Sequence, residues 1–189
     1  MCAVVKGVGG RLDARNGWGV GTWCPALSGR AAASSAWVTL PIDGIMSVGA
    51  QQSLCNSHAH LTLCLVVAAR QRPGGIGIAD PQSHSDPRGS FVGGGTCFYW
   101  LHTHAADGLI HIESPVQRAF TLGNFFDVWG QPLTAARVGP ASGKVTAIVH
   151  QKLYHGDPRS IRLDAFAQIQ LEVCTPLVPP PAISFPARL

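Results

Sequence analysis

The stretch CFYWLHTHAADGLIHIES, residues 97–114, is the part of the sequence that most strongly indicates the fold. Residues 97–104 are rich in aromatic side chains and are typical of a β-strand. The small and polar residues 105–108 favour a turn, and residues 109–114 can return as a partner strand. The stretch therefore predicts a β-hairpin.

Other strands are predicted on both sides of this hairpin. Leucine or valine occupies each odd position of residues 61–67, which is the period of a strand with one buried face. Residues 167–173 alternate in the same way and predict a half-exposed strand, and residues 145–149 predict a shorter one. The sequence is therefore mainly β in character.

One helix is predicted at residues 121–130. Thr121 suits the N-cap, and Gly130 suits the end of the helix. The apolar side chains follow at i, i+3, i+4 and i+7: Leu122, Phe125, Phe126 and Trp129. We expect an antiparallel sandwich or barrel with this one short helix packed on it.

The chain has 189 residues, which suits a single hydrophobic core. Residues 1–35 show no periodic apolar face and are predicted to be a disordered or poorly formed N-terminal tail. The single β-rich, metal-binding domain is expected over residues 36–175. Residues 176–189 are expected to form an extended, proline-rich C-terminal segment.

The composition argues against several classes of protein. Only 13% of the residues are charged and 46% are apolar, which is typical of a globular protein and not of a disordered one. The net charge of +4 comes from scattered basic residues without a cluster, so no nucleic-acid partner is predicted. No apolar run approaches the ~18 residues that a transmembrane helix needs. Residues 17–27 match a secretory signal peptide only poorly.

The six cysteines are widely and irregularly spaced and contain no C-x-x-C pair. One interpretation is that they form one or two disulfides in an oxidising compartment. The other is that most of them are small buried hydrophobic residues. By themselves they do not define a metal site.

The histidines form a pattern that chance does not explain. Eight histidines placed at random would give roughly 0.3 H-x-H pairs, yet the chain has two, His58 with His60 and His102 with His104. Residues i and i+2 of a strand project from the same face. Each pair can therefore present two imidazoles to one cation.

A third i, i+2 pair, His111 and Glu113, lies where the predicted hairpin would set it beside His102 and His104. Neutral nitrogen ligands suit transition metals better than magnesium or calcium. We therefore expect a divalent transition metal, copper or zinc, and the following candidate ligands: His58, His60, His102, His104 and His111. Glu113 is the carboxylate whose spacing ties it to these histidines, which makes it a candidate catalytic acid/base.

Three functions remain open from these residues. The first is a metal-binding domain that acts in binding, sensing or transfer. The second is a metal-dependent hydrolase or oxygenase that uses the same histidines with Glu113. The third is a structural or interaction domain in which the histidines are incidental. Nothing in the sequence identifies a protein partner.

Several motifs resemble those of a family of uncharacterised bacterial and archaeal proteins. They are NSHAHL at residues 56–61, YWLHTH at 99–104, GLIHIESP at 108–115 and TLGNFFDVW at 121–129. The resemblance covers residues 41–186, and it implies an extracytoplasmic location because members are usually secreted or membrane-anchored. Many members carry a histidine where this chain has Asn56. The family implies no established activity.

Two enzyme families offer partial matches. In cupins an H-x-H pair is followed within a few residues by a glutamate ligand, and Glu113 lies too far from His104 for that spacing. JAMM-type zinc proteases have an aromatic strand ending in H-[ST]-H, similar to residues 99–104, followed by a serine and an aspartate. Here Gln117 stands where that aspartate is expected.

Overall fold

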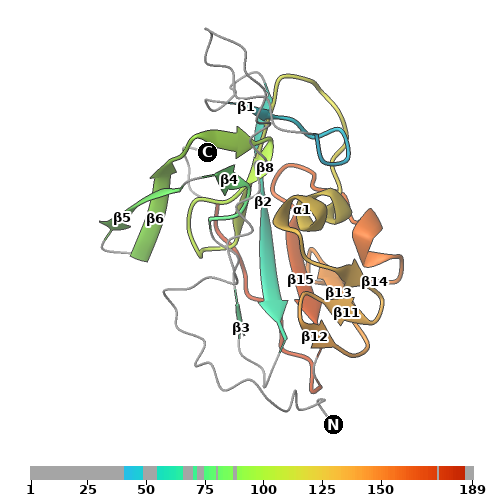
Figure 1. The fold of residues 1–189 in the computed structure, drawn as a ribbon. Helices are drawn as coiled ribbons and strands as arrows, with labels where there is room; N and C mark the ends of the chain where they lie inside the picture. The colour runs from blue at the N-terminus through green and yellow to red at the C-terminus, as the bar shows by residue number, and fades with distance from the viewer. Residues whose placement is uncertain are drawn as a thin grey trace, which may run out of the picture.

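The computed structural model of the chain describes residues 41–48, 55–65, 70–71, 75–79, 81–86, 89–173 and 175–185. The predicted N-terminal tail, residues 1–35, lies outside these ranges. The described residues are mainly β, with one short α-helix, as the sequence predicts (Figure 1). No helix among them is long and apolar enough to cross a membrane.

A seven-stranded open sheet forms the centre of the fold, in the order β14–β13–β15–β2–β9–β8, with β3 also paired to β2. Its strands are β2 (Cys55–Cys64), β3 (Arg70–Gln71), β8 (Leu101–His102), β9 (Leu109–Ser114), β13 (Thr146–Val149), β14 (Lys152–Tyr154) and β15 (Gln168–Glu172). β2 and β15 are parallel, and the other pairs are antiparallel. The parallel pair departs from the antiparallel arrangement expected from the sequence, because a long connection that includes the helix separates the two strands.

Smaller sheets flank this one: β1 (Ser47–Val48), β7 (Cys97–Tyr99) and β4 (Ile78–Ala79); the hairpin β5 (Gln82–Asp86) and β6 (Gly89–Gly94); and β10 (Leu133–Thr134), β11 (Arg137–Val138) and β12 (Ala141–Ser142). Residues 97–104 are thus two strands, not the single strand that the sequence predicts. The backbone of Trp100 explains the break, because its N–H donates to Met46 and its carbonyl accepts from Glu113, which lie in different parts of the structure. Cys97 on β7 is disulfide-bonded.

The predicted helix is present as α1 (Leu122–Trp129). The hydroxyl of Thr121 accepts a hydrogen bond from the Asn124 backbone, and the Asn124 side chain accepts one from the Thr121 backbone, which completes a capping box. Gly130 ends the helix with a φ of 69°. A single 3₁₀ turn, η1 (Pro158–Ser160), lies against α1.

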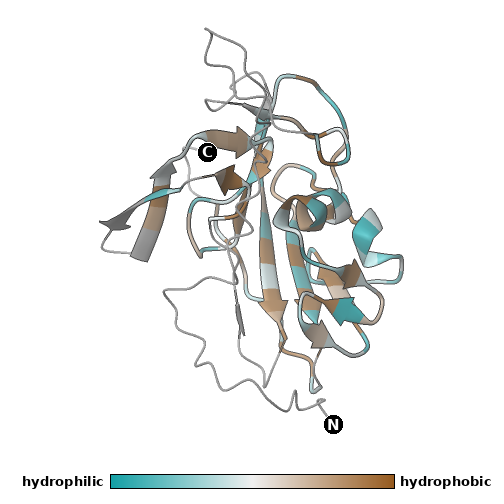
Figure 2. Cartoon of the chain, in the orientation of Figure 1, coloured by the Kyte–Doolittle hydropathy of each residue, from teal (hydrophilic) through white to brown (hydrophobic). Residues whose placement is uncertain are grey.

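The two faces of the central sheet differ in chemistry. Ala59, Leu61 and Leu63 of β2 belong to the main hydrophobic core together with Phe125 and Phe126 of α1. His58, His60 and Thr62 alternate with these residues and therefore face away from the helix. Figure 2 shows the change of hydropathy along β2 that goes with this alternation. Figure 1 shows α1 on one side of β2 and β4 with the β5–β6 hairpin on the other. We call these the helix face and the polar face.

Phe126→Ala tests the contribution of the helix face. Phe126 is fully buried, so the substitution is expected to lower the free energy of unfolding by ~3–5 kcal/mol. Urea denaturation followed by tryptophan fluorescence measures the loss. Val116→Ala is the control, because Val116 is exposed and should change stability by no more than about 0.5 kcal/mol. Equal effects of the two substitutions would contradict this description of the core.

Candidate metal centre

Three histidines converge on the polar face of the central sheet. Strand pairing places His111 on β9 directly opposite both His58 on β2 and His102 on β8. His104 follows shortly after β8. One ring nitrogen from each of His102, His104 and His111 lies within 4.8 Å of the other two. These three residues, here called the histidine triad, are close enough to hold one ion.

Backbone carbonyls fix the ring orientations of two triad members. His102 Nδ1 lies 2.8 Å from the Tyr99 carbonyl oxygen, and His104 Nδ1 lies 2.5 Å from the Val92 carbonyl oxygen. Since a carbonyl only accepts, each Nδ1 carries the proton and donates it. In the neutral rings, each Nε2 is therefore unprotonated and can accept a proton or bind a metal ion. This is the arrangement that commonly orients metal-binding histidines.

The two Nε2 atoms face each other at 3.2 Å. Two lone pairs at this distance repel unless a proton or a metal ion lies between them. Two nitrogens bound to one tetrahedral zinc ion at ~2.0–2.1 Å would lie about 3.3 Å apart. The spacing of His102 and His104 thus matches that of neighbouring ligands on a single ion.

His111 connects the triad to two further polar groups. Its Nδ1 lies 3.0 Å from His58 Nε2 and 3.6 Å from Glu113 Oε1. The other carboxylate oxygen of Glu113 is buried and has no hydrogen-bond partner among the residues that the structure describes. If His111 bound an ion through Nε2, its protonated Nδ1 could donate to His58 or Glu113. Hydrogen bonds of this kind, made by the second ring nitrogen, typically support a histidine that binds metal.

Apolar side chains cover the triad on the side away from the sheet. Phe91 stacks on His104 with ring centres 5.1 Å apart, and Phe98 meets His102 edge-on at 5.5 Å. Phe98 itself packs with Ile78 in a second, smaller hydrophobic cluster. His102 is fully buried. The nitrogens therefore lie in a poorly hydrated environment.

This environment favours the neutral forms of His58, His102 and His104. Burial, with help from neighbouring histidine charges, lowers the pKa of His102 to about 3 and that of His58 to about 4. Burial also lowers the pKa of His104. For Glu113, burial acts to raise the pKa, but the contact with His111 and the nearby histidine charges hold the pKa below its usual value. Neutral imidazoles and an ionised carboxylate are the forms that bind metal.

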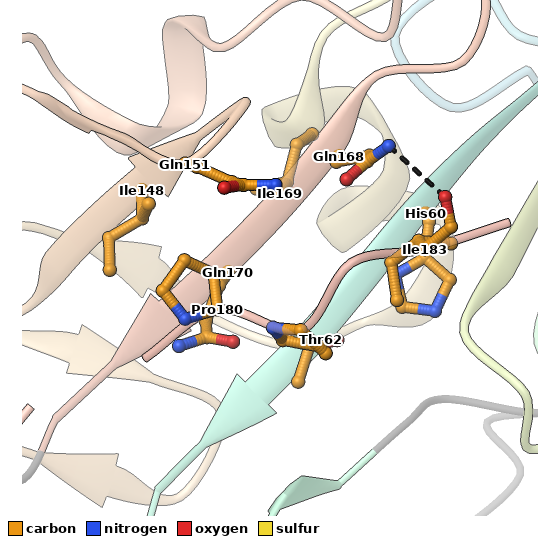
Figure 3. Close-up of a pocket in the computed structure, with 10 residues that line it drawn as sticks. His60, Thr62, Ile148, Gln151, Gln168, Ile169, Gln170, Pro180 and Ile183 are labelled. Atoms are coloured by element: carbon orange, nitrogen blue, oxygen red, sulfur yellow. Dashed lines mark hydrogen bonds between the residues drawn. The ribbon is translucent and has the colours of Figure 1, made fainter. Parts of the chain in front are cut away.

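His60, the fifth predicted ligand, lies on the polar face but outside the triad. Its Nε2 is 3.0 Å from the carbonyl oxygen of Asp107, in the turn between His104 and His111. It also borders a small hollow that Pro180 and Ile183 help to line (Figure 3). The geometry gives His60 a role in holding this turn, and its assignment as a ligand stays a prediction.

The sequence did not indicate the groups that orient the triad. The carbonyls of Tyr99 and Val92 carry no side-chain signature, and Phe91 lies outside the strands that the sequence predicts. Gly108 offered one usable signal, because a glycine between two histidine strands marks a tight turn or a close backbone approach.

No protein-family profile matches this chain, and neither curated proteins nor solved structures yield a match. The interpretation of the site therefore depends on its own geometry.

The lowered histidine pKa values predict acid sensitivity of the metal-free protein. In the unfolded chain these histidines have pKa values near 6.5, so below that pH the unfolded state binds more protons than the folded state. The free energy of unfolding should therefore be greatest above pH ~6.5 and fall as the pH approaches the folded values of about 4 for His58 and about 3 for His102. Urea denaturation in the presence of a chelator, repeated at several pH values, measures this free energy of unfolding. An unchanged free energy of unfolding between about pH 7 and 5 would contradict the burial described here.

Gly108→Ala tests the turn between His104 and His111. Gly108 has a φ of 88°, and a Cβ there would lie 2.5 Å from the Leu61 carbonyl oxygen and 2.8 Å from His60 Nε2. We expect stability to fall by about 2–3 kcal/mol, because left-handed strain and overpacking both contribute. We also expect weaker zinc binding in a calorimetric titration, because the turn is displaced.

Gly130→Ala is the matched control for Gly108→Ala. Gly130 has a φ of 69°, but no atom lies within 4 Å of the position a Cβ would take. The Gly130→Ala variant should lose only about 1 kcal/mol of stability and keep its zinc affinity. Similar losses of zinc affinity in both variants would show that the turn does not position the triad.

Proposed function

We propose that this chain binds one transition-metal ion, zinc or copper, through His102, His104 and His111, and that it acts in metal binding, sensing or transfer. The observation that carries the proposal is the 3.2 Å separation of the His102 and His104 Nε2 atoms, with each ring held by a carbonyl at its other nitrogen. An apolar cover and neutral imidazoles support it further.

The burial of the site favours metal binding over catalysis. His102 and His104 are both buried. Structural metal sites are closed by protein ligands, whereas catalytic sites keep a position open for water or substrate. His58 lies 3.0 Å from His111 and is placed to support the triad, or to complete a fourth position after a small shift of its ring.

We also propose that this protein acts outside the cytoplasm. The resemblance of residues 41–186 to an uncharacterised family with secreted or membrane-anchored members favours a location outside the cytoplasm. The disulfide at Cys97 supports the same location, because disulfides persist mainly in oxidising compartments.

A second candidate function is a metal-dependent hydrolase or oxygenase in which Glu113 is the acid/base. It is favoured by Glu113 Oε2, which is buried and finds no hydrogen-bond partner within the described part of the chain. This oxygen could accept a hydrogen bond from metal-bound water. A third candidate, a structural or interaction domain with incidental histidines, requires that no metal binds stoichiometrically.

The double substitution of His102 and His104 by alanine tests the metal site. Elemental analysis of untagged wild-type protein should give about one metal ion per chain, and the double variant should give none. Metal present at 100 times its Kd should stabilise the wild type by about 2.7 kcal/mol and the variant not at all. In the presence of a chelator, the wild type should lose this stabilisation, and the stability of the variant should not change. A double variant that kept the wild-type metal content would disprove the assignment.

Phe126→Ala is the control that separates the site from the scaffold. Phe126 lies on the helix face, so the variant should be less stable with or without metal but keep its metal while folded.

Replacement of the bound metal by cobalt tests whether the site is closed, as for metal binding, or open, as for catalysis. An open coordination position would let azide change the visible spectrum of the cobalt protein, and a closed site would leave it unchanged.

A further inference from the structure

The groups around the histidine triad carry one unbalanced negative charge. Histidine binds metal as a neutral imidazole, so the triad itself adds no charge. Glu113 is buried beside the triad, interacts electrostatically with all three rings and forms no ion pair with a lysine or arginine of the described residues. Its Oε2 has no hydrogen-bond partner within the same ranges. A buried carboxylate without a cation is costly, so the site lacks one positive charge.

The burial of the triad limits the charge that an ion can bring to it. His102 and His104 are 0% and 6% exposed, and Phe98 and Phe91 pack on their rings. The cost of moving an ion from water into such surroundings grows with the square of its charge, and any net charge left there is poorly screened. A monovalent ion together with Glu113 gives a neutral site. A divalent ion leaves one excess positive charge.

The number of ligands favours the same kind of ion. The triad supplies three nitrogens, and the described part of the chain brings no fourth histidine, cysteine or carboxylate ligand atom within the same 4.8 Å. His58 instead lies against the Nδ1 of His111 at 3.0 Å. Zinc in closed sites is almost always bound by four ligands. Monovalent copper is stable with two or three, and copper accepts imidazole nitrogens.

We propose that the ion held by the histidine triad is monovalent copper, Cu(I), and that Glu113 is its counter-charge. This inference rests on the proposed metal site, and it replaces the divalent ion that the sequence predicts. Sodium and potassium are also monovalent but prefer oxygen ligands, which the triad does not offer. Glu113 acts through its charge and not as a ligand, so it determines which ion the site prefers.

Competition titrations of the full-length chain, without oxygen and near neutral pH, test the ion. Cu(I) is supplied as its bicinchoninate complex, and zinc is measured against a coloured zinc chelator. The wild-type Kd for Cu(I) should be at least about a hundredfold lower than the Kd for zinc, because only Cu(I) leaves the buried site neutral. Binding of both ions should be lost in the double alanine variant of His102 and His104.

The outcomes separate this inference from the proposed function. A smaller preference for Cu(I), or Cu(I) binding that survives the double substitution, would overturn monovalent copper as the ion of the triad. The metal site itself would stand if zinc binding still required His102 and His104. If neither ion required these two histidines, the proposed function would fail as well.

Glu113→Gln tests the counter-charge, because it keeps the shape of the side chain and removes its charge. The Coulomb energy is proportional to the charge of the ion, so zinc should lose twice the binding free energy that Cu(I) loses. If the affinity for Cu(I) falls about tenfold, the affinity for zinc should fall about a hundredfold. Equal losses for the two ions, or no loss, would contradict this role of Glu113.

Glu172→Gln is the matched control for Glu113→Gln. Glu172 is also buried, but it lies on β15 and accepts hydrogen bonds from Gln170 and Val178. β2 and β9 separate β15 from β8 in the central sheet. The control should therefore leave the affinities for both ions unchanged while the chain is folded. If Glu113→Gln does not fold, the comparison of Cu(I) with zinc in the wild type still decides the proposal.

Discussion

The structure depends on the alternation of side chains along β2, because this strand is covered on both faces. Its residues Ala59, Leu61 and Leu63 lie in the main core that also contains the apolar side chains of α1. His58, His60 and Thr62 alternate with them and face away. Neighbouring strands in register extend each face, so β9 and β8 bring histidines beside His58 while β15 brings glutamines beside Thr62. A slip of one residue would move the histidines into the core and the leucines onto the polar face.

Much of this arrangement could be predicted from spacing. The caps and apolar stripe of α1 are local signals, and the i, i+2 histidine pairs identify a shared face without knowledge of the tertiary structure. The convergence of His102, His104 and His111 depends on information that spacing does not contain. Which ring nitrogen is available depends on backbone carbonyls from β7 and β6, and those contacts exist only after the strands have packed.

Other features could not be predicted because they arise from long-range pairing. His60 has the same spacing as His58, yet it turns to the Asp107 carbonyl, since Gly108 brings that turn close to β2. Gln170 and Glu172 alternate as an exposed row would, and only the covering by residues 176–185 makes them buried. Residues 97–104 look like one strand, although backbone hydrogen bonds with Met46 and Glu113 divide them at Trp100.

The parallel pairing of β2 with β15 has a consequence for the order in which the chain folds. Gln168 pairs with His60 although the two residues are 108 positions apart, whereas the contacts that join β2, β9 and β8 link much closer residues. Pairings between distant segments form slowly, because a large loop must close before any contact compensates the lost entropy. The three histidines can thus gather before the sheet is complete. An ion captured at that stage would act as a template for folding, and the yield of native protein would then depend on the metal supply while the chain is being made.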